Sequence, residues 1–250
     1  MNKPLIVEDV CVDFGGLRAL NEVSLNLEYG ERRALIGPNG AGKTTLFHVI
    51  SGLIRPTKGR ILFFGEDVTR TSLHRRAALG LGRTFQITSL FFLLTVEDNL
   101  LLSLKALDAR VKDISLKTIR SYKHLLSQAE SFLKKSDLWE KRDLPVRNLS
   151  YGEQRKLEIL LALAQNPKVL LLDEPTCGLS PEEVTTMTSM IKALPRDVIL
   201  LIIEHDLDVA FELTETVTIL NAGSILAEGS KEEVRSNPEV QRVYLGAQQK

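Results

Sequence analysis

Apolar and polar residues alternate along the first part of the chain. The stretches LIVEDVCVDF, VSLNLEYG and RRALI show the two-residue period of β-strands. Gly15–Gly16 and Gly30 separate these stretches, where turns are expected. Further on, LFHVISGL repeats apolar residues at helical spacing, RILFFG has strand character, and TSLHRRAALG favours a short helix. The pattern therefore predicts an N-terminal portion built mainly of antiparallel strands.

From about Leu90 to Gln165 the periodicity becomes helical. Apolar residues recur every three or four positions, with Lys, Asp, Glu and Ser between them. Glycine is nearly absent until Gly152. We interpret residues 90–165 as a helical subdomain inserted between residues 1–89 and 166–250, which together form the core of one domain.

The last third alternates strands and helices. KVLLLDEP and DVILLIIEHD are unbroken apolar runs, which are typical of strands covered on both faces of a sheet. Between them, Ser180 and Pro181 provide a helix N-cap and first turn. Two short strands, TVTILNAG and SILAEGS, and two short helices complete the chain. Such alternation predicts an α/β fold with a largely parallel sheet.

Composition narrows the function classes. Lysine plus arginine and aspartate plus glutamate both number 32, so the formal net charge is zero and no dedicated nucleic-acid partner is expected. No apolar run reaches the roughly 18 residues that a membrane-spanning helix needs, and the N-terminus lacks a signal-peptide core. Cys11 and Cys177 form no metal-ligand spacing. We expect two free thiols in a protein of the reducing cytosol.

Residues 37–45, GPNGAGKTT, join a predicted strand to a predicted helix and fit the pattern G-x-x-x-x-G-K-[ST]. Glycines let successive backbone N–H groups face phosphate oxygens, and the positive end of the helix points at the same place. Lys43 can reach the β- and γ-phosphates, and the Thr44 hydroxyl can bind Mg²⁺. The alternative is a strand–turn–helix corner without a ligand. The flanking elements favour a site for a nucleoside triphosphate.

Two further strand ends carry charged or titratable groups. Asp173 ends a buried strand, where an ionised carboxylate needs a cation partner such as Mg²⁺. Glu174 follows and can accept a proton from an attacking water. His205 ends the next buried strand, where it can contact the γ-phosphate or hold the water and Glu174. Because parallel strands bring their carboxyl ends to one edge, we favour a functional site over a structural histidine and a strand-end cap.

The stretch LSYGEQRKLEILLALA predicts a second anion site. Ser150 and Gly152 open an amphipathic helix whose hydroxyl and backbone N–H groups can donate to an anion. One bound nucleotide does not need two phosphate-binding helix ends. Two chains placed head to tail do, because each offers its second helix end to the nucleotide of the other.

Together these motifs resemble the nucleotide-binding subunit of an ATP-binding cassette (ABC) transporter over nearly the whole chain. GPNGAGKTT resembles the Walker A loop, LLLDEP the Walker B strand with its catalytic glutamate, and LSYGEQ the family signature. Gln86 in RTFQ matches the Q-loop, His205 the switch histidine, and Phe14 the aromatic residue that stacks on adenine. The implied fold is a P-loop NTPase core.

The resemblance implies a site for ATP and Mg²⁺. The metal ligands are expected to be Thr44, Gln86 and Asp173, and the catalytic groups Lys43, Glu174 and His205. The remaining nucleotide-binding residues are expected to be Phe14, Gly37, Pro38, Asn39, Gly40, Ala41, Gly42, Thr45, and, acting on the opposite subunit, Ser150 and Gly152.

The residues within and around the motifs resemble one subfamily. FGGLRALNEVSLNL, GLGRTFQ, LSYGEQRKLEI and LIIEHDLDVAFEL resemble the ATPases of branched-chain amino acid uptake systems. ATPases for urea uptake and lipopolysaccharide export share much of this wording and stay open as alternatives. The expected partners are integral-membrane permease subunits, a second ATPase (this chain or a related one) and, indirectly, a periplasmic or extracellular solute-binding protein. The implied location is the cytoplasmic face of the cell membrane.

Some positions depart from the family pattern. Tyr151 and Glu153 replace the commoner Gly and Gln of the signature, and Cys177 and Ser180 are unusual in the loop after Walker B. The apolar segment SLFFLLTVEDNLLLS follows the Q-loop, where the family receives a cytoplasmic helix of the permease. We expect Phe91, Phe92 and Leu94 to line part of that groove, with packing inside the helical subdomain as the alternative.

Two other function classes fit less well. A non-transport ABC ATPase in DNA repair or on ribosomes typically has a long coiled-coil insertion or two cassettes, and this chain has one copy of each motif and no sustained heptads. An unrelated P-loop kinase or GTPase would leave LSYGEQ without a purpose.

Overall fold

The computed structural model describes residues 3–84, 90–106, 108 and 118–247. Within them, the strands form two sheets. The antiparallel sheet has the order β2-β1-β4-β5, with bounds β1 Leu5–Phe14, β2 Leu17–Leu27, β4 Lys58–Phe63 and β5 Glu66–Asp67.

The second sheet has the order β10-β9-β3-β8-β7-β6 and is parallel except for the β9–β10 pair. Its strands are β3 Arg32–Ile36, β6 Leu81–Arg83, β7 Val169–Asp173, β8 Ile199–Ile203, β9 Thr216–Asn221 and β10 Ser224–Ser230. The predicted fold class, a largely parallel sheet with an N-terminal antiparallel portion, is confirmed. The sequence pattern did not predict β5 and β6, which have only two and three residues.

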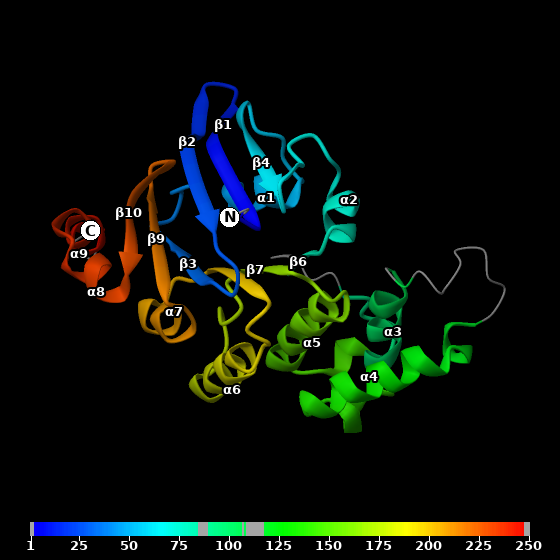
Figure 1. Cartoon of the computed structure of the whole chain (residues 1–250). Helices are drawn as coiled ribbons and strands as arrows, with labels where there is room; N and C mark the ends of the chain where they lie inside the picture. The colour runs from blue at the N-terminus through cyan, green and yellow to red at the C-terminus, as the bar shows by residue number, and fades with distance from the viewer. Residues whose placement is uncertain (1–2, 85–89, 107, 109–117, 248–250) are drawn as a thin grey trace.

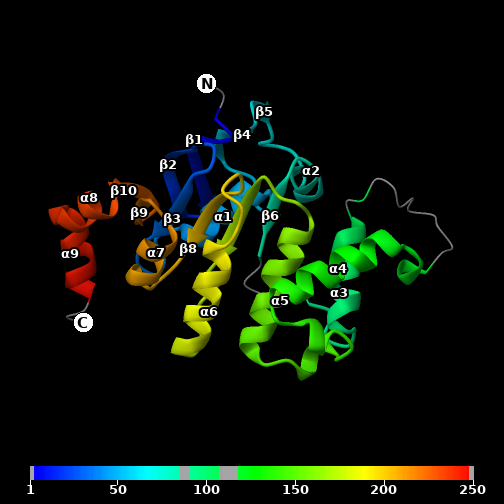
Figure 2. The ribbon, with the colours of Figure 1, turned by 60° about the horizontal axis from the view of Figure 1, so that its bottom comes forward.

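Helices flank the parallel sheet and gather beyond its β6 edge. The described helices are α1 Lys43–Ser51, α2 Leu73–Ala78, α3 Val96–Ala106, α4 Lys123–Lys135, α5 Tyr151–Ala164, α6 Pro181–Lys192, α7 Leu207–Leu213, α8 Lys231–Ser236 and α9 Pro238–Ala247. Figure 1 shows α3, α4 and α5 at one end of the molecule and α8 and α9 at the opposite end. In Figure 2, as in Figure 1, α6 lies between α5 and α7.

The two faces of the parallel sheet bury different layers. Val169 and Leu171 of β7 join a core shared with α1 and the antiparallel sheet. Leu170 and Leu172 point the other way and join a core that includes residues of α6 and α7. Because successive strand residues face opposite sides, an unbroken apolar run is what a strand covered on both faces requires.

A third cluster lies among α3, α4 and α5. Leu100, Leu125, Leu133 and Leu157 belong to it and are fully buried. Short 3₁₀ turns at Ile119–Ser121, Trp139–Lys141 and Val146–Asn148 complete the described part of this region. The helices therefore have an apolar core of their own.

The order of the parallel strands positions the site. β8 pairs with β3 on one side and with β7 on the other. Their carboxyl ends therefore meet at one edge of the sheet, where α/β proteins bind ligands. The loop after Ile36, the carboxylate of Glu174 and the imidazole of His205 all follow these three strand ends.

A buried arginine holds α1 beneath this edge. Arg76 of α2 is 1% exposed, and its Nη1 donates to the carbonyls of Val49 and Ile50, both at 2.6 Å. Its Nη2 donates to Val68 O, also at 2.6 Å. Burial lowers the pKa of Arg76 to about 10, so the guanidinium stays charged at neutral pH. A cation at the carboxyl end of α1 stabilises the carbonyls of its last turn, of which Val49 O also accepts from Gly52 N at 3.1 Å.

We expect Arg76→Met to lower the free energy of unfolding by about 2 to 4 kcal/mol, because three buried carbonyls lose a charged donor. Arg75→Met is the matched control, since the Arg75 side chain is 58% exposed and pairs only with Glu66 at 3.6 Å in the described contacts. Urea unfolding of both variants measures the difference. Equal stability of the two variants would contradict the structural role given to Arg76.

Candidate nucleotide-binding site

The loop between β3 and α1 depends on its glycines. Gly40 and Gly42 have φ angles of 78° and 101°, in the left-handed region that favours glycine. A Cβ at Gly37 would lie 2.1 Å from Leu220 O, and one at Gly42 would lie 2.7 Å from Ala19 O. Neighbouring backbone therefore packs directly against the loop and fixes its path.

Lys43, the first residue of α1, closes this loop. Its side chain is buried, and Nζ donates to Gly37 O at 2.7 Å and to Pro38 O at 3.1 Å. Burial lowers the pKa of Lys43, and the carboxylates of Glu174 and Asp173 oppose that shift. The ammonium group thus lies where the loop, the helix N-terminus and both carboxylates converge.

The rest of the predicted loop is described as well. Asn39 and Gly40 are exposed, Ala41 is buried, and Thr44 and Thr45 are half-buried in the first turn of α1. Phe14, at the end of β1, is 49% exposed, as a side chain that stacks on a ligand can be. A helix N-terminus preceded by inward backbone N–H groups is suited to bind phosphate.

Asp173 is a buried carboxylate with one oxygen unpaired. It is 1% exposed, its Oδ2 lies 3.4 Å from Arg83 Nη2, and its Oδ1 has no hydrogen-bond partner among the described residues. Burial raises the pKa of Asp173, and the charge of Arg83 opposes that shift. Arg83 is itself tied down, because Nη1 donates to Ser51 Oγ at 2.7 Å. An unpaired buried carboxylate oxygen suits a cation.

Glu174 and His205 are in direct contact. Oε1 of Glu174 lies 2.7 Å from Nε2 of His205. The two side chains come from adjacent strands, since Asp173 and Ile203 are register partners and Glu174 N donates to Ile203 O at 2.9 Å. Glu174 has a φ of 49°, a sparsely populated conformation that surrounding structure must hold. A carboxylate held against an imidazole is a constellation for general-base chemistry.

Ser150 caps α5 at the predicted second anion site. Its Oγ accepts from Glu153 N at 3.3 Å, and the Glu153 carboxylate accepts from Ser150 N at 3.0 Å, which forms a capping box. Glu153 also pairs with Lys141. Ser150 and Tyr151 are exposed and open to a partner, whereas Gly152, the other predicted residue of this anion site, is buried.

A family model described as ABC transporter matches residues 20–177. The chain belongs to the ABC transporter family. A second model, described as branched-chain amino acid ATP-binding cassette transporter, matches residues 224–249.

Curated relatives match almost the full length. LivG of Escherichia coli K12, a high-affinity branched-chain amino acid transport ATP-binding protein, is 38% identical over 98% of this chain and 99% of its own. BraF of Pseudomonas aeruginosa, with the same description, is 36% identical with the same coverage.

Solved structures show the same fold. A nucleotide-free cassette from an ABC transporter has a TM-score of 0.84 and 30% identity, over 97% of this chain and 98% of its own. A dimeric cassette in a post-hydrolysis state with ADP and Pi has a TM-score of 0.76 and 26% identity, over 90% and 98%. The predicted ABC cassette fold and ATPase class are confirmed, and the chain is a nucleotide-binding ABC ATPase subunit.

The unusual signature residue Tyr151 makes contacts through its ring and its hydroxyl. The ring of Tyr151 packs beside Gly178, Arg155 lies over the same ring at 5.3 Å, and Arg155 Nε donates to the tyrosine hydroxyl at 3.0 Å. A Cβ at Gly152 would lie 2.4 Å from Glu183 Oε1. Sequence reasoning missed these contacts, which brace the start of α5 against the segment that leads into α6.

The predicted metal ligands are only partly described. Asp173 and Thr44 lie at the same edge of the sheet, and Gln86 lies outside the described residues. Within the described ranges, no group of three or more His, Cys, Asp or Glu side chains could hold a metal ion. Asp173 Oδ1 is the unpaired oxygen that a metal here would use, and Mg²⁺ beside phosphates commonly takes its other ligands from nucleotide and water oxygens.

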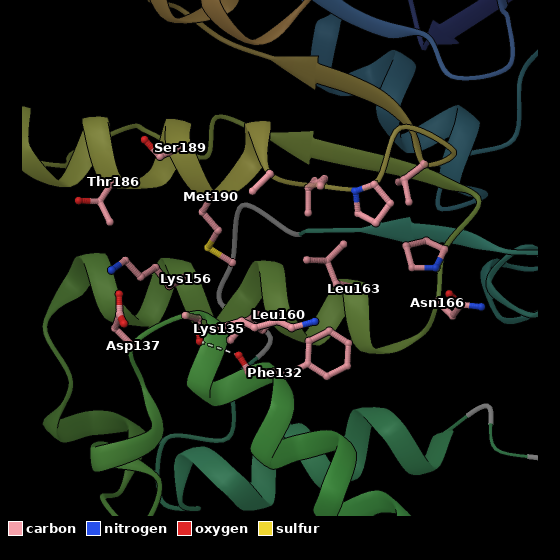
Figure 3. Close-up of a pocket in the computed structure, with 16 residues that line it drawn as sticks. Phe132, Lys135, Asp137, Lys156, Leu160, Leu163, Asn166, Thr186, Ser189 and Met190 are labelled. Atoms are coloured by element: carbon pink, nitrogen blue, oxygen red, sulfur yellow. Dashed lines mark hydrogen bonds between the residues drawn. The ribbon is translucent and has the colours of Figure 1, made fainter.

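Two cavities lie beside the helical region of the cassette. One, of about 380 Å³, is lined by Arg83, Phe91, Leu102 and Glu158 among others, next to the predicted permease groove. The other, of about 610 Å³, lies between α4, α5 and α6, and none of the predicted site residues lines it. Figure 3 shows Met190 reaching from α6 toward α5 in this second cavity.

Among the helices of the described residues, none has the length and apolar character that a membrane span requires.

One buried carboxylate near the site was not anticipated from sequence. Glu204, between β8 and His205, is 2% exposed and accepts from Thr176 Oγ1 at 2.9 Å. Burial raises the pKa of Glu204 from its ordinary 4.5 to about 7, while the hydrogen bonds from Thr176 oppose the shift. The native protein therefore keeps this proton at pH values where the unfolded chain has released it.

We expect this proton to make stability depend on pH. Between about pH 4.5 and 7 the native state binds more protons at Glu204, so wild-type stability falls as pH rises. Glu204→Gln cannot lose a proton at this position. The free energy of unfolding of the variant minus that of wild type should therefore increase by about 2 to 3 kcal/mol from pH 5 to pH 8.

Urea unfolding at both pH values measures this change. Glu212→Gln serves as a control, because the Glu212 side chain is 53% exposed. The control should keep a constant difference from wild type across the range. A Glu204→Gln advantage that is constant or shrinks with pH would show that Glu204 does not hold the proton.

Proposed function

We propose that this ABC subunit hydrolyses Mg·ATP to drive uptake of branched-chain amino acids through an integral-membrane permease. The observation that carries the catalytic part is the 2.7 Å contact between Glu174 and His205, beside the unpaired Oδ1 of Asp173. The names of the full-length relatives and the C-terminal match over residues 224–249 support branched-chain amino acids over urea or lipopolysaccharide.

The phosphate loop binds the nucleotide. Backbone N–H groups of residues 37–45 and the ammonium group of Lys43 hold the β- and γ-phosphates, and Phe14 stacks on the adenine. Thr44, Asp173 and Gln86 are the residues that would hold Mg²⁺, and Mg²⁺ supplies neutralisation of phosphate charge.

Hydrolysis uses the carboxylate of Glu174 as general base. Glu174 accepts a proton from water as the water oxygen bonds to the γ-phosphorus, and the bond from that phosphorus to the β–γ bridging oxygen breaks. ADP and phosphate are the products. His205 orients Glu174 through their contact, and in this proposal its imidazole also faces the γ-phosphate. In this proposal the left-handed backbone conformation of Glu174 directs its carboxylate toward His205 and the attacking water.

A second ATPase completes the site. We place Ser150 and Gly152 of one subunit against the nucleotide of the other, in a head-to-tail pair with a related chain or a second copy. The similar cassette that was solved as a dimer supports this arrangement. Each chain then acts as one nucleotide-binding domain, with residues 1–89 and 166–250 as the ATP-binding core and residues 90–165 as the helical subdomain.

The permease docks on the apolar surface after the Q-loop. Phe91 and Leu93 are 58% and 77% exposed, and Phe92 and Leu94 are each 38% exposed. Glu158 lines the adjoining cavity, and its Oε1 has no hydrogen-bond partner among the described residues. Clustered apolar side chains beside a buried polar acceptor are typical of an interface. This docking places the chain at the cytoplasmic face of the membrane, with the solute-binding protein acting indirectly.

An affinity purification tests the proposal as a whole. Tagged protein is purified from detergent-solubilised cells, and co-purifying chains are identified by mass spectrometry. We expect two hydrophobic permeases and a second ATPase among the co-purified chains. The genes of these chains should lie next to a gene for a solute-binding protein of the amino acid class. Recovery of ribosomal or DNA-repair proteins alone would contradict the transport role and leave the ATPase chemistry intact.

We predict that Glu174→Gln lowers kcat for ATP hydrolysis at least about 100-fold, because the general base is lost. ATP binding should persist, and size-exclusion chromatography with Mg·ATP should show an ATP-bound dimer. Glu130→Gln, an exposed carboxylate of α4, is the control and should hydrolyse ATP like wild type. Wild-type turnover by Glu174→Gln would remove this residue from the role of base.

We predict that Phe91→Asp abolishes co-purification of the permease, because a buried unpaired carboxylate in the interface opposes docking. ATP binding by the isolated subunit should be unchanged. Tyr29→Asp is the control, since Tyr29 is 65% exposed on the turn before β3. If both variants retain the permease equally, the docking surface lies elsewhere.

A further inference from the structure

A buried hydrogen bond links the two segments that carry the reactive pair. Oε1 of Glu204 accepts from Thr176 Oγ1 at 2.9 Å and from Thr176 N at 3.3 Å. Both side chains are nearly inaccessible, at 2% and 7% exposure. Thr176 is the second residue after Glu174, and Glu204 directly precedes His205.

This link lies just beyond the end of the β-ladder. The pairing of β7 with β8 ends at Asp173 and Ile203. After that register, Glu174 N still donates to Ile203 O, but the segments that follow β7 and β8 then leave regular strand geometry. The Glu174–His205 contact is half-open to solvent, since the His205 side chain is 46% exposed. The Glu204–Thr176 contact is its buried counterpart.

The backbone conformation of Glu174 gives such a link a purpose. A non-glycine residue at φ 49° stays there only when neighbouring contacts hold it. The bond from Thr176 to Glu204 fixes the chain two residues further on, and the residue next to Glu204 is the histidine that contacts Glu174. A single buried acceptor thus restrains the backbone on both sides of the reactive pair.

Burying this acceptor is unfavourable unless hydrogen bonds compensate. A carboxyl group without donors loses its hydration, and an apolar residue at position 204 would avoid that loss. Thr176 gives the Glu204 carboxyl group two donors, its hydroxyl and its backbone N–H, and the backbone N–H of His205 also contributes. Among these donors, the Thr176 hydroxyl is the side-chain group that joins the two strand ends through Glu204.

We propose that Glu204 is a positioning residue for ATP hydrolysis: through Thr176 it holds Glu174 and His205 in the orientation that the attacking water needs. The inference rests on the proposed function in one respect, that Glu174 is the general base. Glu204 itself touches neither nucleotide nor water in this account.

Three variants separate the link from a merely structural role. Glu204→Leu removes the acceptor, Thr176→Val removes the hydroxyl donor but keeps the N–H, and Glu204→Gln keeps an acceptor oxygen. We expect Glu204→Leu to lower kcat at least about 10-fold with KM for ATP within about twofold, since misplaced reacting groups slow chemistry more than binding. Glu204→Gln should stay within about threefold of wild-type kcat, because the hydrogen bond survives.

The double variant tests whether the two side chains act together. If they act through one contact, Glu204→Leu/Thr176→Val should be no slower than Glu204→Leu alone. Should Glu204→Leu not fold, Thr176→Val carries the test by itself, with an expected loss in kcat of about three- to fivefold for one weakened hydrogen bond.

Thr218→Val is the matched control. The Thr218 hydroxyl is fully buried in β9, where it accepts from Arg33 Nη1 at 3.3 Å and donates to Glu228 at 3.2 Å. This variant should lower the thermal midpoint and leave kcat unchanged. Measuring the thermal midpoint of every variant shows whether a loss of kcat simply follows a loss of stability.

Several outcomes would overturn the inference. These are a folded Glu204→Leu or Thr176→Val with wild-type kcat, a Glu204→Gln as slow as Glu204→Leu, or a kcat loss in Thr218→Val equal to that in Thr176→Val. Glu174→Gln, assayed in parallel, separates the two levels. If it is inactive while Glu204→Leu is fully active, only the positioning role fails. If Glu174→Gln is fully active, the proposed base itself is wrong.

Discussion

The buried carboxylate of Asp173 is the constraint on which the rest of the site depends, because it requires positive charge close by. An ionised group at 1% exposure is tolerated only beside positive charge, and Arg83 supplies it on one oxygen while the other has no partner among the described residues. Lys43 adds a second buried cation at the same edge, held by two loop carbonyls. The protein thereby maintains opposed charges in a poorly solvated place, where electrostatic interaction with phosphates and a metal ion is strong.

The parallel sheet makes this concentration of charge possible. Because β3, β8 and β7 are neighbours, the phosphate loop, His205 and Glu174 emerge at one edge without long connections. The same sheet is buried on both faces, which gives the edge a rigid base. Polar contacts then refine the strand ends: Arg83 reaches from β6 to Asp173, and Thr176 reaches from the segment after β7 to Glu204. Rigid strands with polar loops at their ends are the usual basis of precise catalytic geometry.

Local patterns predicted most of the fold, and they singled out Lys43, Glu174 and His205, which the structure brings to one edge of the parallel sheet. The apolar runs of β7 and β8, the glycines before Lys43 and the N-caps Ser150 and Ser180 are all signals that neighbouring residues carry together. Contacts between distant positions were not predictable. Arg83 and Asp173 are 90 residues apart and Thr176 and Glu204 are 28 apart, and no periodicity reports such pairs. At the unusual signature residues, Tyr151 contacts Arg155 four positions along the same helix, a spacing that sequence does report, whereas the pairing of Glu153 with Lys141 spans twelve residues and is evident only from the structure.

The central claim is that chemistry at the sheet edge drives transport through a permease. Proteoliposomes that contain the co-purified complex, with Mg·ATP on the side of this subunit and the solute-binding protein on the other, test it most directly. The account predicts accumulation of labelled leucine that requires ATP, that unlabelled isoleucine or valine suppresses, and that urea does not affect. ATP hydrolysis in the same vesicles without any leucine movement would contradict the account.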